Sequence, residues 1–534
     1  MFVRALALSA ISVGLYFVGS SAALADQELL NRYCLGCHTP SDAGLSRISE
    51  QRKTPEGWEM TISRMQLMHG LVIADDDGRS AAEIKAALVK HLADSQGLAP
   101  SEALPARYLP ERLPAVQEAA LYPEHIQITC GRCHSSGRHA LQRRSAEEWE
   151  KSVHFHIGQY PSIEYSLYGR DREWLDITLN EIIPEIAADY PLQSQAWDEW
   201  QATAKQSLSG SWQLAGEMPG KGRFVGTMSV TQDGDDRYFA TFTGQFDNGE
   251  RFSSRGQSIV YTGYEWRGKF TIDGVDYLQV LAADESFNQM QGRMFQNEHN
   301  ELGVVLTAQR DSGQPLLTAV WPQQLKTGST TTLTLHGANL SGSVVLPAGV
   351  ELLAVERDSA SEWRAQVEVA ADARVGQFAI SHGAAELNDA VALYRQLDAV
   401  TVLPDYSVAR IGGNGGSRNK MYGAFTAYGV DYGADRTAGT ADDIALGSLP
   451  ASWRVEPWDE TAAHDQDVKF AGTMDAVTGI FTPADAGPNP ERKQSTNNVG
   501  NLKVVATVSD GSQTVEGDAQ MIVTVQRWNN PPLR

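Results

Sequence analysis

The spacing of apolar residues divides the chain into a helical first part and a longer second part made of strands. Up to about residue 207, apolar positions recur every three or four residues, as at Ile84, Leu88 and Leu92, which predicts helices over 26–33, 80–94 and 174–186. Beyond that point apolar and polar residues alternate, as at Tyr238 and Ala240, and this period of two predicts β-strands. Strands are also expected over 330–335 and 504–508.

The change of pattern predicts a multidomain α + β protein. An all-α domain is expected over 26–170, with a helical connector over 171–207 that leads out of it. An antiparallel β domain resembling a barrel or sandwich follows over 208–312. The last two units, 313–398 and 399–534, have the size and strand spacing of immunoglobulin-like β sandwiches. A length of 534 residues agrees with several domains.

Residues 1–25 have the pattern of a cleaved secretory signal peptide. Arg4 is the only charged residue there, an apolar run follows, and Ala23 and Ala25 supply small residues at the cleavage position. The apolar run is shorter than the roughly 20 residues that a membrane span needs. We therefore expect an exported, soluble mature protein. The formal charge of −22 argues against a general nucleic-acid role.

All four cysteines lie in two Cys-x-x-Cys-His strings, Cys34-Leu35-Gly36-Cys37-His38 and Cys130-Gly131-Arg132-Cys133-His134. This is the attachment pattern of haem c, because two thiols at this spacing can add to the two vinyl groups of one haem. The following histidines, His38 and His134, then reach the iron. Structural zinc is the alternative, but two strings in an exported chain favour two covalent haems. No thiol remains for a disulfide.

An internal repeat suggests the second axial ligand of each iron. Thr54 and Ser145 each precede an expected helix, and aligning these caps superposes Trp58 on Trp149. Seven residues beyond each Trp, on the same helical face, lie Met65 and His156, which are common haem ligands.

Other side chains could take these places. Met68 is the alternative to Met65, although the residue that matches it in the repeat is Gln159, and His154 is the alternative to His156. We expect His139 at the surface and His91 in helix packing.

Two further patterns give weaker indications of a binding site. The glycine-rich stretch 412–416 lacks the Lys-Ser/Thr of a phosphate-binding loop, and we interpret it as an ordinary loop. Four aspartates near it miss the spacing of an EF-hand and leave a metal site there undecided: Asp431, Asp435, Asp442 and Asp443.

The helical region resembles the cytochrome c fold. More specifically, Tyr33-Cys34-Leu35-Gly36-Cys37-His38 and Gln51-Arg52-Lys53-Thr54-Pro55-Glu56-Gly57-Trp58-Glu59-Met60-Thr61-Ile62, followed by three β domains, resemble the α subunit of quinohemoprotein amine dehydrogenase. The resemblance implies a periplasmic heterotrimer that oxidises primary amines to aldehydes and ammonia. It also implies a small γ subunit with a cysteine tryptophylquinone, a β-propeller β subunit, and a copper protein or cytochrome c as external acceptor.

This chain has no spare thiol for such a quinone, so its 12 Trp are interpreted as packing or interface residues. The chain itself is interpreted as an electron conduit without catalytic residues of its own. A dihaem peroxidase is the alternative from another class, and it needs an open iron position. A plain dihaem electron carrier with β binding modules is a third possibility.

Overall fold

A computed structural model of the chain describes residues 21–76, 78–104, 106, 122–131, 134, 137–164, 173–414 and 419–526. It is mostly β, with several sheets that include a closed eight-stranded barrel. The chain divides into two compact units, one up to Gly97 and one from Leu98 onward. None of the described helices is both long and apolar enough to cross a lipid bilayer.

In the part of the first unit that the structure describes, residues 21–76 and 78–97, there are three helices and short strands. α1 runs without a break through the predicted cleavage position after Ala25. α2 packs against α3, and both begin at capped residues. The elements are α1 (Ser21–Cys34), β1 (Pro40–Ser41), β2 (Gly44–Leu45), β3 (Gln51–Lys53), α2 (Pro55–Met68) and α3 (Ala81–Ser95).

The second unit begins with short helices that include two π-helical turns, η2 and η4. Its predicted helix over 174–186 consists of α8, η4 and α9 and extends to Asp189. The elements are α4 (Pro100–Ala103), α5 (Glu124–Ile126), η2 (Gln127–Gly131), α6 (Gly137–Ala140), β4 (Gln142–Arg144), α7 (Ala146–Gln159), η3 (Pro161–Glu164), α8 (Trp174–Ile177), η4 (Thr178–Ile182), α9 (Ile183–Asp189) and α10 (Gln195–Ala202).

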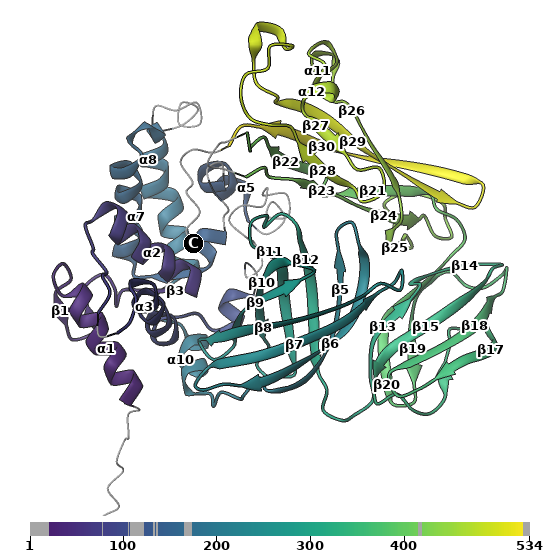
Figure 1. The fold of residues 1–534 in the computed structure, drawn as a ribbon, viewed down its shortest axis with the longest axis horizontal. Helices are drawn as coiled ribbons and strands as arrows, with labels where there is room; N and C mark the ends of the chain where they lie inside the picture. The colour runs from purple at the N-terminus through teal and green to yellow at the C-terminus, as the bar shows by residue number, and fades with distance from the viewer. Residues whose placement is uncertain are drawn as a thin grey trace, which may run out of the picture. The chain divides into compact units, whose positions relative to one another are not determined.

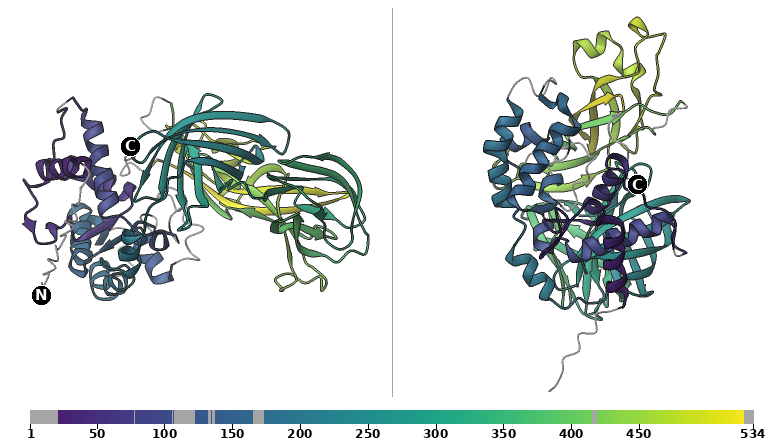
Figure 2. Two further views of the ribbon diagram at one scale, coloured as in Figure 1. Left: turned by 90° about the horizontal axis from the view of Figure 1, so that it is seen from below. Right: turned by 90° about the vertical axis from the view of Figure 1, so that its left-hand side faces the viewer.

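An antiparallel barrel follows, closed in the order β10-β11-β12-β5-β6-β7-β8-β9 (Figures 1 and 2). Alternate side chains point inward and fill it with aromatic and aliphatic groups, among them Phe242 and Trp266, so the interior is a packed core. The strands are β5 (Gly210–Met218), β6 (Gly222–Gln232), β7 (Arg237–Phe246), β8 (Arg251–Tyr261), β9 (Glu265–Ile272), β10 (Val275–Ala283), β11 (Gln289–Gln296) and β12 (Gly303–Arg310).

α10 belongs to the core of this barrel. Trp197 and Trp200 are 7% and 4% exposed and lie in the same apolar cluster as the barrel interior. The Trp200 indole stacks on Phe287 at 6.0 Å between ring centroids, and its Nε1 donates to the carbonyl of Thr262 at 2.9 Å. The predicted connector 171–207 is therefore partly a closing element of the next domain (Figure 1).

The next β unit consists of two four-stranded sheets that share one apolar cluster. Their orders are β13-β15-β18-β17 and β14-β20-β19-β16. The strands are β13 (Leu316–Trp321), β14 (Gln324–Lys326), β15 (Thr330–Ala338), β16 (Val344–Val345), β17 (Val350–Asp358), β18 (Glu362–Val369), β19 (Gly376–His382) and β20 (Ala385–Tyr394). The strand expected over 330–335 is confirmed as part of β15.

The last unit has three sheets, β21-β24-β25, β22-β30-β29-β26 and β23-β28-β27, around a second cluster. The expected strand 504–508 lies in β29. The elements are β21 (Ala399–Leu403), β22 (Tyr406–Arg410), β23 (Gly423–Ala424), β24 (Thr426–Asp431), β25 (Ile444–Leu449), β26 (Ser452–Pro457), α11 (Glu460–His464), α12 (Asp467–Phe470), β27 (Gly472–Met474), β28 (Ile480–Pro483), η5 (Lys493–Ser495), β29 (Gly500–Asp510) and β30 (Gln513–Thr524).

Candidate functional site

The repeat found in the sequence is also a repeat of local structure. α2 and α7 both have 14 residues, and the side chains of Thr54 and Ser145 accept hydrogen bonds from amides three residues ahead. The buried Trp58 donates its indole N–H to the carbonyl of Gln96, just after α3 (3.0 Å). Trp149 donates in the same way to Tyr190, just after α9 (3.1 Å). The equivalent indole hydrogen bond thus joins α2 to the end of α3 after the first Cys-x-x-Cys-His string, and α7 to the end of α9 after the second.

The first string begins at the C-terminal end of α1. Cys34 is half-buried and Cys37 is exposed. Burial raises the pKa of the Cys34 thiol to about 11, with a smaller contribution from Cys37. His38 Nδ1 lies 2.8 Å from the carbonyl oxygen of Ser46. Because a carbonyl only accepts, Nδ1 carries the proton and Nε2 is left with its lone pair for a metal ion.

The two methionine candidates of α2 differ in exposure. Met65 is half-buried, whereas Met68 is 52% exposed. Leu35, inside the string, and Leu67 and Val72, near the end of α2, are also exposed. Exposed apolar side chains within the string and near the end of α2 would be covered in part by a haem attached there.

The second string lies at the π turn η2, which contains the half-buried Cys130. Cys133 lies outside the described residues. The imidazole of His134 faces that of His156 on α7, with 6.4 Å between ring centroids and 40° between planes. A metal–imidazole bond is about 2.0 Å and the centroid lies about 1.1 Å behind the nitrogen, so two rings on one iron have centroids about 6 Å apart. The pair therefore has the spacing that axial coordination of one iron requires.

A hydrogen bond along α7 fixes the tautomer of His156. Its Nδ1 donates to the carbonyl of Ser152 at 2.6 Å, and Nε2 is again the nitrogen left for the metal. His154, the alternative ligand, is exposed. The structure thus brings His134 and His156 together and places the alternative ligand, His154, at the surface of α7.

His139 is buried, contrary to the expectation of a surface position. It is 7% exposed and lies edge-on between Tyr122 and Tyr190, at 5.3 and 5.6 Å between ring centroids. Its Nδ1 has no hydrogen-bond partner, and burial lowers the pKa of the imidazole to about 4. The expectation failed because both tyrosines are distant in sequence. His91 hydrogen-bonds Gln27 at 3.3 Å.

Four family models match successive parts of this chain. They describe the quinohemoprotein amine dehydrogenase α subunit: its haem-binding domain over residues 24–197, domain II over 205–311, domain III over 314–395 and domain IV over 400–533. The chain belongs to this family. It is thus an α subunit of an amine-oxidising oxidoreductase of several subunits, with a haem-binding domain at its N-terminus.

Comparison of this α subunit with curated proteins gave no match. Among solved structures, two examples match parts of the chain. A redesigned β barrel, b11L5F_LGL, is 16% identical and covers 20% of this chain and 92% of its own, with a TM-score of 0.18. Mouse clustered PcdhgC3 EC1-3 is 10% identical and covers 45% of this chain and 76% of its own, with a TM-score of 0.17.

The acidic loop of domain IV uses its carboxylates within the protein. Asp431 accepts from the amides of Arg395 and Gln396 and pairs with Arg436 at 2.6 Å. Asp442 accepts from two backbone amides of the same loop. Across the described residues, no three His, Cys, Asp or Glu side chains gather as a metal site. Residues 415 and 416 of the glycine-rich stretch lie outside the described residues.

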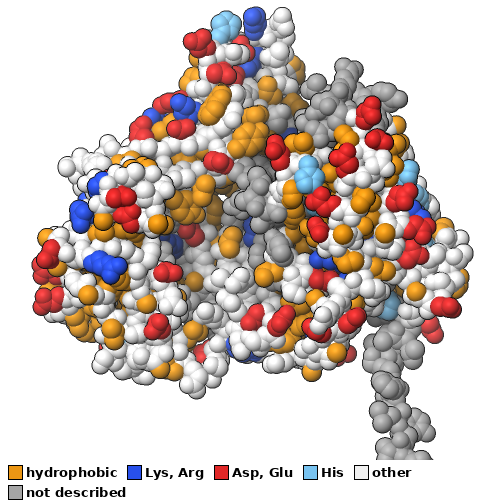
Figure 3. Space-filling view, turned by 180° about the vertical axis from the view of Figure 1, so that it is seen from behind, with side chains coloured by type: hydrophobic (Ala, Val, Ile, Leu, Met, Phe, Trp, Pro, Cys, Tyr) orange, Lys and Arg blue, Asp and Glu red, His pale blue; other side chains and the backbone are white. Residues whose placement is uncertain are grey.

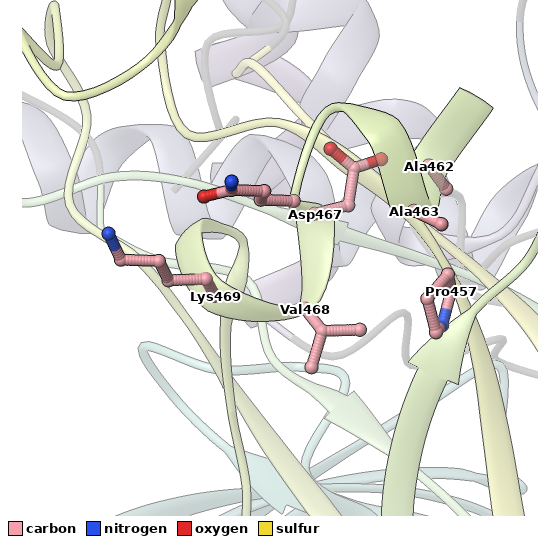
Figure 4. Close-up of a pocket in the computed structure, with 7 residues that line it drawn as sticks. Pro457, Ala462, Ala463, Asp467, Val468 and Lys469 are labelled. Atoms are coloured by element: carbon pink, nitrogen blue, oxygen red, sulfur yellow. The ribbon is translucent and has the colours of Figure 1, made fainter. Parts of the chain in front are cut away.

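A hollow of about 380 Å³ lies elsewhere in domain IV, beside α11 and α12 (Figure 4). Ala462, Ala463 and Val468 form much of its lining. The carboxylate of Asp467 is buried and is held by Arg492 and by the amide of Asn501, each at 2.9 Å. The acidic side chain of the lining is therefore held by contacts within the protein. Acidic side chains are spread over the face shown in Figure 3, as the net charge of −22 leads one to expect.

Proposed function

We propose that this α subunit holds two covalently bound haems c and conducts electrons away from amine oxidation. Cys34 and Cys37 would attach the first haem, with His38 and Met65 as axial ligands of its iron. Cys130 and Cys133 would attach the second, with His134 and His156 as axial ligands. When bound, the haems supply one-electron transfer between the amine-oxidising partner and an external carrier.

The facing imidazoles of His134 and His156 carry this proposal. They come from the second string and from the repeated helix, and they lie at the spacing of two ligands on one metal ion. The His156 ring lies beside Trp174, a member of the apolar cluster against which Cys130 packs, and this cluster would keep water from the attached group. The hydrogen bond from His156 Nδ1 to Ser152 holds the ring in the tautomer that can bind the metal.

Amine oxidation itself belongs, in this proposal, to a partner. A cysteine tryptophylquinone consumes a cysteine thiol, and all four thiols of this chain lie in the two attachment strings. We assign the quinone to a small γ subunit, and expect a β-propeller β subunit and a soluble copper protein or cytochrome c as the electron acceptor. The protein would work in the periplasm after removal of residues 1–25.

The β domains would serve as a scaffold for the other subunits, and the two C-terminal ones are proposed to be immunoglobulin-like sandwiches. Their two clusters of buried apolar residues form cores, and no catalytic set of side chains is apparent among their described residues.

Purification of the tagged chain from its natural host tests the proposal. We expect a small quinone-bearing chain and a second large chain to copurify, and a primary amine to reduce both haems of the complex. The isolated chain should not be reduced by amines. A high-spin second haem that reacts with peroxide would instead favour the dihaem peroxidase. Purification of the chain alone, with two low-spin haems, would favour the plain electron carrier.

A further inference from the structure

Trp174 is a buried tryptophan that connects the two sides of the second haem site. It is 7% exposed and begins α8. Its ring lies 6.2 Å from that of His156, with 45° between their planes. Its indole Nε1 donates to the carbonyl of Thr129, at 3.2 Å, within η2. Thr129 is the residue directly before Cys130.

These two contacts act on opposite sides of the attachment site. Thr129 and Cys130 belong to the segment that leads to His134, whereas His156 belongs to α7. The rigid side chain of Trp174 therefore contacts both the segment that leads to His134 and the ring of His156. The Thr178 hydroxyl donates to the Trp174 carbonyl at 2.5 Å, which fixes the backbone of this turn.

The first copy of the repeat lacks this side chain. Trp58 reaches Gln96 after α3, and Trp149 reaches Tyr190 after α9, so α3 corresponds to the segment from α8 to α9. α3 begins with Ser80 as its cap and Ala81 as its first residue, where the second copy begins α8 with Trp174. The tryptophan is a feature of the second site alone, which is the site with two imidazoles.

We propose that Trp174 is a positioning residue that fixes the imidazole plane of His156 and keeps this ring beside the iron. The inference rests on the proposed ligation by His156. The hydrogen bond to Ser152 holds one edge of the imidazole, but it leaves the ring free to tilt about that edge. Packing against the indole removes this freedom, and the bond to Thr129 prevents the indole from moving with the ring.

Two substitutions separate the packing from the hydrogen bond. Trp174→Leu removes the aromatic surface and the N–H, whereas Trp174→Phe removes the N–H and keeps a smaller aromatic ring. Trp197→Phe is the matched control, because Trp197 is equally buried (7%) but lies in the barrel core. His156→Ala removes the ligand itself. Covalent haem content and circular dichroism establish that each variant is folded.

Electron paramagnetic resonance of the ferric protein reports the orientation of the axial planes, and a cyanide titration reports how readily the sixth ligand is displaced. Loss of a group that orients a ligand typically costs about tenfold in metal binding. We therefore expect Trp174→Leu to lower the apparent Kd for cyanide at the second haem by about tenfold and to shift its low-spin signal. Trp174→Phe should show a smaller change in the same direction, and Trp197→Phe none.

Unchanged signals and cyanide affinity in both Trp174 variants, with a strong effect of His156→Ala, would overturn this inference and leave the ligand assignment standing. If His156→Ala also leaves both haems low-spin, the assignment of His156 as ligand fails and the role of Trp174 fails with it. If Trp174→Leu does not fold, Trp174→Phe tests the inference: the smaller change in low-spin signal and cyanide affinity supports it, and no change overturns it.

Discussion

Met65 and Met68 lie within one turn of α2 and differ chiefly in exposure. We predict that Met65→Ala abolishes the sulfur–iron absorption band and lowers the higher of the two haem potentials, because thioether ligation raises the potential of a haem. Met68→Ala is the matched control and should leave both unchanged, since its side chain is 52% exposed. Optical spectra and a stepwise redox titration measure the two effects. A lost band in Met68→Ala alone would reverse the assignment.

The same ligands suggest a direction of electron flow. If Met65 binds the first iron and His156 the second, the first haem should have the higher potential. Electrons would then pass from the quinone to the second haem, on to the first, and out to the carrier. Burial and hydrogen bonds also change potentials, so the titration of His156→Ala, which should disturb the lower potential, is needed beside that of Met65→Ala.

The buried His139 predicts a pH dependence of stability. Its pKa is lowered from 6.5 to about 4, so the unfolded chain binds a proton between these values that the folded chain does not bind. Stability from this group is present above pH 6.5 and is lost as the pH falls. Between pH 7 and pH 5 the loss is about 2 kcal/mol.

His139→Phe should abolish this part of the loss while keeping an aromatic ring between Tyr122 and Tyr190. Urea unfolding of both proteins at pH 7 and pH 5 measures it. An equal loss in the two proteins would contradict the prediction.

At the scale of residues, the two Cys-x-x-Cys-His strings predict haem attachment from sequence alone, because the spacing of the two thiols matches the two vinyl groups of one haem and does not depend on the fold. The sequence did not predict the buried position of His139 or the contact between Trp174 and His156. Their surroundings come from Tyr190, Thr129 and His156, which are distant along the chain, and no local pattern signals such contacts.

Among the elements, the bond from Trp149 to Tyr190 ties α7 to the end of α9. Trp149→Phe keeps most of the buried ring and removes the donor, and we predict a loss of about 1 kcal/mol in unfolding free energy. Trp58→Phe is the equivalent change in the first copy and should cost a similar amount, since Trp58 makes the same bond to Gln96. Denaturant unfolding measures both. A stability equal to wild type in either variant would show that the tie is dispensable there.

The helices of the repeat were predictable from their caps and apolar spacing, and α2 and α7 begin directly after Thr54 and Ser145. The π turns were not. A π turn holds one residue more than an α turn, and a search for a period of 3.6 residues does not detect a single added residue. The helix expected over 174–186 therefore contains η4, which the pattern did not show.

For the whole molecule, the change from helical to alternating pattern located the β region, but not the contribution of α10 to it. Trp197 and Trp200 complete the barrel core from outside the strands. We predict that a fragment 194–312 is more stable to heat than a fragment 208–312, which lacks both side chains, because loss of a buried Trp costs about 3–5 kcal/mol. Calorimetry compares the two. Equal melting temperatures would mean that α10 does not stabilise the barrel.

The scaffold role predicts how the complex responds to shortening. Cutting the chain after residue 312 keeps α10 with its barrel and removes domains III and IV. We expect this truncated chain to keep its haem spectra but to lose partner subunits in size analysis. A complex that stays intact would show that the haem-binding domain and barrel suffice for assembly.

The shared core of α10 and the barrel makes completion of the barrel depend on a segment that precedes it in the chain. A chain made from its N-terminus contains Cys130 and α10 before the first barrel strand exists. Ser194, which caps α10, donates to Glu102, and Glu102 pairs with Arg143 of β4, so α10 is linked to the helical segment around the second Cys-x-x-Cys-His string. A chain that fails to form this segment would leave Tyr264 and Phe287 uncovered at the barrel end. Proteases that degrade unfolded chains could then remove it before it joins the other subunits.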